Sequence, residues 1–443
     1  MSEIRDMDEI IDDECYFRKT DATISDIHNF IVWLNKFRFY NDRMYLYDDE
    51  YGYYVLIDRK NEWFELANFL DVELATKLLP REIKNLLDML RLDLRLHREY
   101  DFEPFSKLIN TENGVVNVIT REILPHSYRF DFTSCINAEY IPDASIDDAP
   151  AFKQFCQTSL NGDFIKIKLL LQIIGYICSN YTTAKKAFML IGKPNSGKSK
   201  IAEWLGNIIG EDNVSNVSFD KLGNRFNIAA FSRSKLNINA EMSLESIKDI
   251  SMFKSLIGGD KIQAEDKGKQ PFTFSNKCKF LFAGNGLPVI KSQDTTEAFI
   301  SRLVILYFPN SISEAERDLE LSEKLYYERD IIFSLAVNEL NELVESGFRF
   351  ELPQEESEQL LEYKENSTHI ESFIDDRCIL SPELKSSTKT LYDAYINYCK
   401  DNCFTPYGMQ TFAAAIRNSR NLIKTKITVK GIQIRGFKGI DIK

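Results

Sequence analysis

The sequence lacks the features that mark membrane, secreted and zinc-binding proteins. No apolar run in its 443 residues approaches the roughly 20 residues that a membrane-spanning helix needs. The first residues are acidic, unlike the basic start of a signal peptide. The eight cysteines are scattered, and no histidine or cysteine partners stand at zinc spacing. We therefore expect reduced thiols in a cytoplasmic protein that has no membrane partner.

Acidic residues outnumber basic ones, with 67 Asp and Glu against 55 Lys and Arg and a net charge of −12. This balance excludes a general coat for nucleic acid. A local basic channel is compatible with it, because electrostatic steering depends on where the charges lie. The length predicts about three domains, and the hydrophobic content of 44% is typical of soluble globular chains.

One segment organises the rest of the chain. It follows an apolar run at 187–191 and precedes a helical pattern from Ile201 to Ile209. Its residues are Gly192-Lys193-Pro194-Asn195-Ser196-Gly197-Lys198-Ser199. Strand, glycine-bounded loop and helix form the context that a P-loop requires, which favours this interpretation over a chance loop before a core helix. We expect backbone N–H groups and Lys198 to hold the phosphates of a nucleoside triphosphate, and the Ser199 hydroxyl to bind Mg²⁺.

Two later strands are expected to end in polar residues of the same site. Residues 235–241 predict a strand with Glu241 at its carboxyl end, where a P-loop site needs an acid for Mg²⁺ or for the attacking water. Residues 279–283 predict the next strand, which leads into a turn with Asn285, whose amide could orient that water. A surface acid and a simple turn are the alternatives.

Further cations follow in the sequence. The segment 258–272 predicts a hairpin, and its charged tip carries Lys267 and Lys269. These lysines either lie in solvent or contact a phosphate backbone. Arg302 stands at the base of a strand expected over 303–308, where it could serve the nucleotide of a neighbouring subunit.

Upstream of the P-loop, aromatic residues over 37–56 predict strands around a turn at Asp49–Gly52, followed by amphipathic helices. Stacking on bases and a half-buried sheet face both explain these aromatics, and the second interpretation is favoured. Asn113-Gly114 predicts a hairpin turn, and residues 152–181 have helical spacing.

The C-terminal part is basic. Residues 386–443 carry ten Lys and Arg against three Asp, a net charge of +7. Two helical patterns are followed by two expected strands about Gly431, with Lys430 and Arg435 near the turn. This order is typical of a winged helix, and its basic patch indicates binding to duplex DNA. A basic domain that docks on the acidic body of the chain is the alternative.

In their order and spacing, these segments resemble the superfamily 3 helicases of the phage/plasmid and poxvirus primase-helicase type. The match is strongest over 186–310 and extends more weakly upstream, through Asn113-Gly114-Val115 and residues 122–126. The resemblance implies a hexameric AAA+-like ring that hydrolyses ATP with Mg²⁺ and moves along single-stranded DNA, usually 3′ to 5′. It implies a role in starting the replication of a phage, plasmid, genomic island or virus, in a bacterial host cytoplasm or at a viral replication site.

The same resemblance assigns roles to individual residues. Lys198 and Ser199 would hold phosphate and Mg²⁺, Glu241 would be the Walker B acid, Asn285 sensor 1, Arg302 an arginine finger acting in trans, and Lys267 the DNA-gripping residue of the hairpin. The chain departs from the family pattern at Ala240, where many members have a second acid, and at Gly268, where an aromatic residue or histidine is common. Only about 100 residues precede the helicase-like half, so any primase is expected on a separate chain.

We therefore predict an α/β fold class. An AAA+-like P-loop domain with a central parallel sheet (186–365) follows an α+β N-terminal domain (1–105) and a helical region (106–185), and precedes a C-terminal winged helix (366–443). The expected partners are single-stranded DNA in the ring channel, duplex or origin DNA at the C-terminal domain, and further copies of the chain. Two other functions fit the sequence: an origin-binding initiator that uses ATP as an assembly switch, and an AAA+ protein remodeller.

Overall fold

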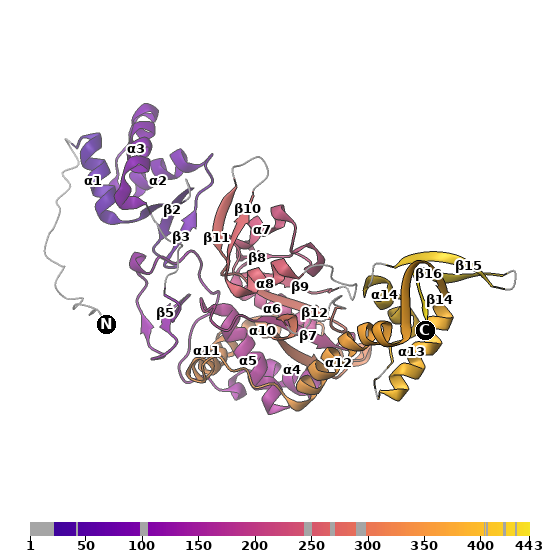
Figure 1. Ribbon diagram of the computed structural model, residues 1–443. Coiled ribbons are helices and arrows are strands. Elements are labelled where there is room, and N and C mark those ends of the chain that lie inside the picture. The colour runs from indigo at the N-terminus through magenta and orange to yellow at the C-terminus, as the bar shows by residue number, and fades with distance from the viewer. Residues whose placement is uncertain are drawn as a thin grey trace. The chain divides into compact units, whose positions relative to one another are not determined.

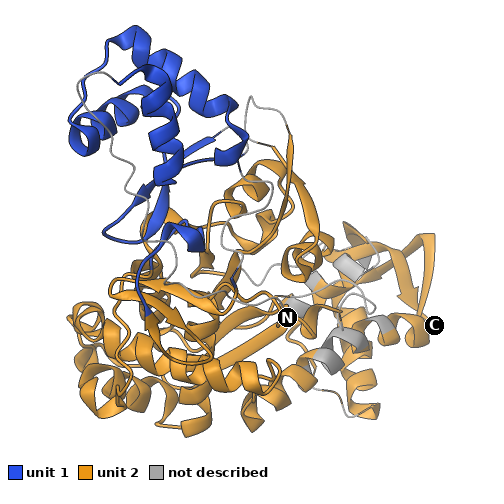
Figure 2. Ribbon diagram, turned by 90° about the vertical axis from the view of Figure 1, so that its left-hand side faces the viewer, with its two compact units in different colours: residues 1–105, 124–135 blue, residues 106–123, 136–443 orange. Residues whose placement is uncertain are grey.

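The computed structural model describes residues 22–40, 43–97, 105–242, 250–265, 271–288, 298–402, 404, 406–419, 422–429 and 432–443. The chain forms two compact units, which Figure 2 distinguishes by colour. One contains residues 1–105 and 124–135, and the other contains residues 106–123 and 136–443. Among the described residues, no helix has both the length and the apolar character needed to cross a bilayer.

The first unit packs three helices against a three-stranded antiparallel sheet. Its elements are α1 (Ile24–Leu34), β1 (Phe37–Tyr40), β2 (Arg43–Asp48), β3 (Tyr53–Leu56), α2 (Glu62–Leu74) and α3 (Pro80–Leu92). Phe37, Phe39 and Met44 are buried against the helices. Tyr47 packs edge-on against Tyr54, with 5.1 Å between the ring centroids. The aromatic residues of this stretch therefore form a sheet core, which is the interpretation that the sequence favoured.

The second unit begins with a small sheet and two helices. These elements are β4 (Leu108–Thr111), β5 (Gly114–Asn117), β6 (Ile123–Leu124), α4 (Pro150–Leu160) and α5 (Phe164–Cys178). Thr111 pairs with Gly114 across β4 and β5, so the expected hairpin turn is confirmed. Asp163 begins α5 as its N-cap, because its carboxylate accepts hydrogen bonds from the N–H groups of Ile165 and Lys166.

The centre of the second unit is a five-stranded parallel sheet (Figure 1). Its strands are β7 (Ala187–Gly192), β8 (Val214–Ser215), β9 (Leu236–Asn239), β12 (Lys279–Gly284) and β13 (Leu303–Phe308). They lie in the order β13-β7-β12-β9-β8, and every neighbouring pair is parallel. Apolar runs suit such strands, because a parallel sheet is buried on both faces. The expected α/β class with a parallel central sheet is confirmed.

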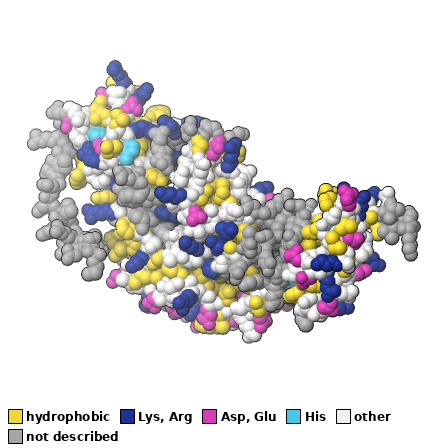
Figure 3. Space-filling view, viewed as in Figure 1, with side chains coloured by type: hydrophobic (Ala, Val, Ile, Leu, Met, Phe, Trp, Pro, Cys, Tyr) yellow, Lys and Arg dark blue, Asp and Glu magenta, His cyan; other side chains and the backbone are white. Residues whose placement is uncertain are grey.

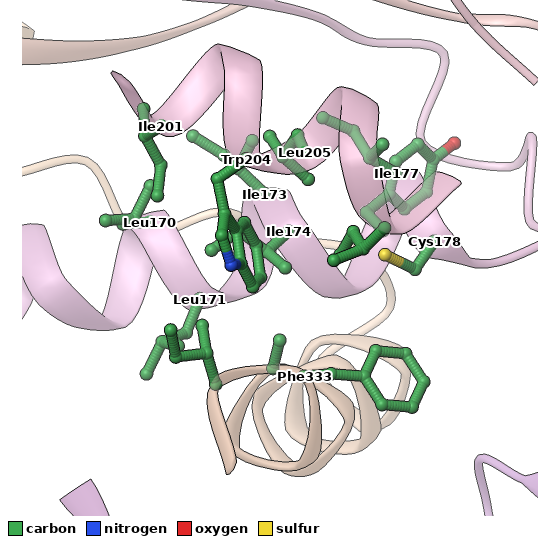
Figure 4. Close-up of a cluster of buried hydrophobic side chains, with 14 of the residues drawn as sticks. Leu170, Leu171, Ile173, Ile174, Ile177, Cys178, Ile201, Trp204, Leu205 and Phe333 are labelled. Atoms are coloured by element: carbon green, nitrogen blue, oxygen red, sulfur yellow. The ribbon is translucent and has the colours of Figure 1, made fainter. Parts of the chain in front are cut away.

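Successive side chains of these strands alternate between two apolar clusters. The helices that supply the clusters are α4, α5, α6 (Lys198–Ile209) and α11 (Arg329–Glu345) on one face, and α7 (Arg225–Phe231) and α8 (Ser251–Gly258) on the other. Phe188 belongs to the first cluster and Met189 to the second. Trp204 of α6 lies fully inside the first cluster, close to Ile173 of α5 (Figure 4), and its indole N–H donates to Leu325 O at 2.8 Å.

An antiparallel hairpin follows α8. It consists of β10 (Lys261–Ala264) and β11 (Phe272–Ser275), with Lys261 opposite Ser275 and Ala264 opposite Phe272. The hairpin expected from the sequence is therefore confirmed. Its tip, with Lys267 and Lys269, lies outside the described residues.

The C-terminal part contains the remaining helices and a second antiparallel sheet. Its elements are α10 (Leu321–Tyr327), α11, α12 (Gln354–Arg377), β14 (Cys378–Ser387), α13 (Thr388–Asp401), α14 (Met409–Ser419), β15 (Ile423–Val429) and β16 (Ile432–Ile442). The strands lie in the order β14-β16-β15. Side chains of α12, α13, α14 and β16, including Phe373, Tyr395, Phe412 and Ile440, share one buried core. We call residues 370–443 the C-terminal module.

Candidate nucleotide-binding site

The loop 192–199 joins β7 to α6, as the sequence predicted. Gly192 is the last residue of β7, and Gly197 is the N-cap of α6. Their φ angles are 148° and 95°, in the region that favours glycine. A Cβ on Gly192 would lie 2.1 Å from the carbonyl oxygen of Phe308, and one on Gly197 would lie 2.6 Å from the ring of Phe155. Conformation and space both require glycine at these positions.

The segment that follows β13 supports this loop. The N–H of Ile312 donates to Asn195 O at 2.9 Å, and the hydroxyl of Ser311 donates to Pro194 O at 2.9 Å. These bonds fix two carbonyl groups of the loop. The sequence does not predict this support, because the residues that follow β13 form no pattern that indicates which loop they contact.

Lys198 is the first residue of α6, and only 7% of its surface is exposed. Its Nζ donates to Gly192 O at 3.0 Å, to Lys193 O at 2.5 Å and to Ser196 Oγ at 2.9 Å. Burial lowers the pKa of this ammonium from its usual value, because the charged form loses solvation. A phosphate bound in the loop would supply the opposite charge and offset that loss.

Three further candidate residues lie close to the carboxyl ends of strands or the start of α6. Ser199 is the second residue of α6, Glu241 follows the end of β9 by two residues, and Asn285 follows the end of β12 by one. All three side chains are exposed. The expected strand ran to Glu241, but β9 ends at Asn239, so Glu241 lies just beyond the strand rather than within it.

The register of the sheet brings these positions together at the carboxyl ends of its strands. Gly284 of β12 pairs with Ile191 of β7, and Phe282 pairs with Asn239 of β9. The N–H of Met242 donates to the carbonyl of β12 that precedes Gly284, at 2.8 Å, and so holds the segment after β9 against β12. Because parallel strands end at the same edge, Lys198, Ser199, Glu241 and Asn285 gather around the loop.

Arg302 lies at the opposite end of the sheet, where the parallel strands begin. It directly precedes β13, which runs parallel to β7, and its carbonyl accepts a hydrogen bond from Ala187 N at 2.7 Å. At about 3.3 Å per residue, the length of β7 separates it from the loop 192–199 by roughly 20 Å. The Arg302 side chain therefore does not reach the loop of its own chain. Its Nη1 donates to Ala298 O at 2.7 Å, and its Nε is buried with no partner among the described residues.

Lys186 stands beside Arg302, and no pattern in the sequence singles it out. Its Nζ donates to Ser301 O at 2.6 Å. Burial and, to a smaller extent, the guanidinium of Arg302 lower the pKa of Lys186. Two cations therefore lie together at this edge of the sheet, a proximity that only the pairing of β7 with β13 reveals.

Of the residues expected to contact DNA, Lys267, Lys269 and Lys430 lie outside the described residues. Arg435 is exposed on β16, directly opposite the exposed Lys426 of β15. Like charges in such a cross-strand pair repel and destabilise the sheet unless an anion lies between them. On the face drawn in Figure 3, basic and acidic side chains are otherwise interspersed, in keeping with the net charge of −12.

Parts of the chain are similar to known protein families and to a curated protein. The family described as "D5 N terminal like" matches residues 33–160, and a family of unknown function (DUF5906) matches residues 190–302. A curated protein of Sputnik virophage, "Putative helicase V13", is 31% identical over 155 residues. The match covers 32% of this chain, and the chain spans only 19% of the length of that relative.

Two solved structures share the fold. Both are apo structures of the NrS-1 C-terminal region, and the matches cover 95% of this chain and 100% of theirs. The sequence identity is 12% in each case, and the TM-scores are 0.50 and 0.51. At this level of identity, the likeness to these structures shows a shared fold. Residues 33–160 are thus similar to the D5 N-terminal family, and the fold is similar to that of the NrS-1 C-terminal region.

Proposed function

We propose that the chain is an ATP-dependent DNA helicase that acts in replication initiation of a phage, plasmid, genomic island or virus. The observation that carries this proposal is the buried ammonium of Lys198 in a glycine-bounded loop, with Glu241 and Asn285 at the ends of neighbouring parallel strands. This is the arrangement that phosphoryl transfer from a nucleoside triphosphate needs, since catalysis there depends on positioning and on charge.

In this proposal, the N–H groups at the start of α6 and the ammonium of Lys198 bind the phosphates of ATP. Ser199 and Glu241 fit Mg²⁺, because a hydroxyl and a carboxylate are oxygen ligands that this ion accepts together with substrate phosphates. The described residues contain no group of three His, Cys, Asp or Glu that could hold a metal, so the nucleotide would complete the ligand set. Bound Mg²⁺ would neutralise charge on the phosphates. The amide of Asn285 then orients the attacking water.

Arg302 belongs to a neighbouring site in this proposal. Because it lies at the far edge of its own sheet, it can complete only the site of an adjacent subunit. We therefore propose an AAA+-like ring of identical subunits, a hexamer that moves 3′ to 5′ as the family resemblance implies. Single-stranded DNA passes through the ring, where Lys267 and Lys269 of the hairpin contact its phosphates.

The C-terminal module supports a second, different DNA contact. Two helices followed by the strands β15 and β16, with β14 as the third strand, fit a winged helix. Lys424, Lys426 and Arg435 are exposed on these strands. Lys430, which lies outside the described residues, stands between the two strands in the sequence. We propose that this surface binds duplex or origin DNA.

A forked-duplex assay with ATP and Mg²⁺ tests the proposal. We expect the protein to displace a strand, and Lys198→Ala to abolish both hydrolysis and displacement, because it removes the charge that holds the phosphates. Lys200→Ala is the matched control. Lys200 lies on the same helix as Lys198, but its ammonium donates to Ser322 Oγ of α10 at 2.7 Å, so turnover should persist. Hydrolysis without strand displacement would favour the assembly switch or the protein remodeller over the helicase. Normal turnover in Lys198→Ala would refute the site.

A further inference from the structure

One helix contacts both the candidate nucleotide site and the C-terminal module. α12 runs for 24 residues, from Gln354 to Arg377, and leads from the elements of the parallel sheet into β14 (Figure 1). Its first turn contacts β13, its middle contacts the Asn285 loop, and its last turns lie in the core of the C-terminal module.

The first turn of α12 is fixed to the edge strand of the parallel sheet. Glu356 has no exposed surface, and its carboxylate accepts a hydrogen bond from Tyr307 N at 2.9 Å. Lys166 of α5, which is also buried, donates to Tyr307 O at 3.3 Å and lies 2.6 Å from Glu355 and 3.4 Å from Glu356. Glu356 and Lys166 thus bind the N–H and C=O groups of Tyr307. On an outer strand, these are groups that an additional strand would otherwise pair with.

The middle of α12 holds the loop that follows β12. The hydroxyl of Tyr363 donates to Pro288 O at 2.5 Å, three residues after Asn285. Leu287, from the same loop, packs against the apolar cluster that also includes Leu360 and Tyr363. A hydrogen bond therefore ties the Asn285 loop to α12, and both pack against the same apolar cluster.

The last turns of α12 are part of the C-terminal module. Ile370 follows Tyr363 by seven residues, so it lies on the same face of the helix, about 10 Å further along. Ile370, Phe373 and Ile374 are buried in one core with Tyr395. A displacement of the Asn285 loop that moves Tyr363 must therefore also displace the core that supports the basic strands.

We infer that Tyr363 is a positioning residue, which holds the Asn285 loop for hydrolysis and transmits the nucleotide state through α12 to the C-terminal module. The inference rests on the proposed function. If the chain hydrolyses ATP as proposed, ATP and ADP make different contacts with Asn285, and this difference biases the position of α12. The affinity of the C-terminal module for duplex DNA should then differ between the ATP-bound and ADP-bound protein, by a factor in the usual range for coupled sites, ~5 to ~150.

Tyr363→Phe tests the inference, because it removes the hydroxyl and keeps the ring. We expect kcat for ATP to fall ~10-fold with KM unchanged, the loss that one hydrogen bond of this kind produces. The ratio of duplex affinities in ATP and ADP, measured by anisotropy, should fall towards one. Tyr392→Phe is the matched control, since its hydroxyl donates to Tyr407 O at 2.9 Å within the C-terminal module. It should keep both kcat and the affinity ratio.

The possible outcomes distinguish failure of the proposed function from failure of the inference about Tyr363. If the wild-type protein does not hydrolyse ATP, the proposed function fails. If it does, but Tyr363→Phe keeps its kcat and its affinity ratio, only the inference fails. Equal reductions in Tyr392→Phe would also overturn the inference, because they would show a general decrease in the stability of the module.

Discussion

His369 is a single residue whose charge state the fold controls. It lies on α12 inside the C-terminal module with no exposed surface, among the rings of Tyr395, Phe404 and Tyr407. Its Nε2 is 3.4 Å from the hydroxyl of Tyr395, and its Nδ1 has no partner among the described residues. Burial lowers the pKa of the imidazole from 6.5 to about 4, because these surroundings do not solvate a charge.

This shift predicts that the C-terminal module loses stability in mild acid. The unfolded chain binds a proton at His369 below pH 6.5, whereas the folded chain does so only near pH 4. The unfolded state therefore gains protons first, and its free energy falls relative to the folded state as the pH decreases between these values. We expect a loss of about 2 kcal/mol between pH 7 and pH 5.

Urea unfolding at several pH values measures this loss. His369→Phe should flatten the pH dependence in this range, because a phenyl ring that does not titrate replaces the imidazole. His97→Gln, a change at an exposed histidine, should leave the dependence as it is. An equal pH dependence in the wild type and in His369→Phe would contradict the assignment.

At the scale of elements, the sequence predicts individual strands but not the contacts between residues that are far apart in the chain. Apolar runs were sufficient to predict β7, β9, β12 and β13, because both faces of these strands are buried. β14 was not predicted, since it contains Pro382 and its register shifts between Leu380 and Lys385, so no regular alternation is present. The contact of Tyr307 with Glu356 links residues 49 positions apart, and no pattern of spacing indicates it. The roles of the candidate site residues stay predictions.

The hairpin of β10 and β11 gives a prediction about Lys267. Lys267→Ala should leave basal ATP turnover unchanged, because the loop 192–199 is not altered. The concentration of single-stranded DNA that gives half-maximal stimulation should rise ~10-fold, the effect of removing one charge-assisted hydrogen bond. Lys261→Ala, at the exposed base of the same hairpin, is the control and should behave as wild type. Equal stimulation of Lys267→Ala and wild type would place the DNA elsewhere.

The strands β15 and β16 give a second prediction at this scale. Deletion of residues 386–443 would cut β14 and expose the apolar side of α12, so substitutions test the basic surface more cleanly. Replacing Lys426 and Arg435 together by Gln should weaken duplex binding. It should also reduce the slope of log K against log salt by roughly 0.9 for each DNA phosphate that the variant no longer neutralises.

The control for this double variant lies on the other face of the same sheet. Lys385 and Lys438 are also exposed and directly opposite each other. Their replacement by Gln removes the same charge, but it should keep the salt slope of the wild type. Anisotropy titrations on duplex DNA at several salt concentrations measure both variants. Equal slopes for all three proteins would show that the basic strands bind something other than DNA.

At the scale of the whole molecule, the position of Arg302 sets a geometric requirement. The loop 192–199 and Arg302 lie at opposite edges of one sheet, so a single chain cannot bring them together. In a ring with head-to-tail contacts, the amino edge of one subunit can face the carboxyl edge of the next. Each complete site then takes its phosphate-binding loop from one subunit and its arginine from the neighbour.

Subunit mixing tests this requirement. Arg302→Ala should lower ATP turnover by ~10³-fold or more while nucleotide binding persists, because the arginine stabilises charge that develops only in the transition state. Lys198→Ala is inactive for a different reason, and it retains Arg302. In an equal mixture of the two variants, about a quarter of the interfaces combine an intact loop with an intact arginine, so up to that fraction of wild-type turnover should return. Rings that exchange subunits and show no recovery at any ratio would mean that Arg302 serves only the structure of its own chain, through its bond to Ala298.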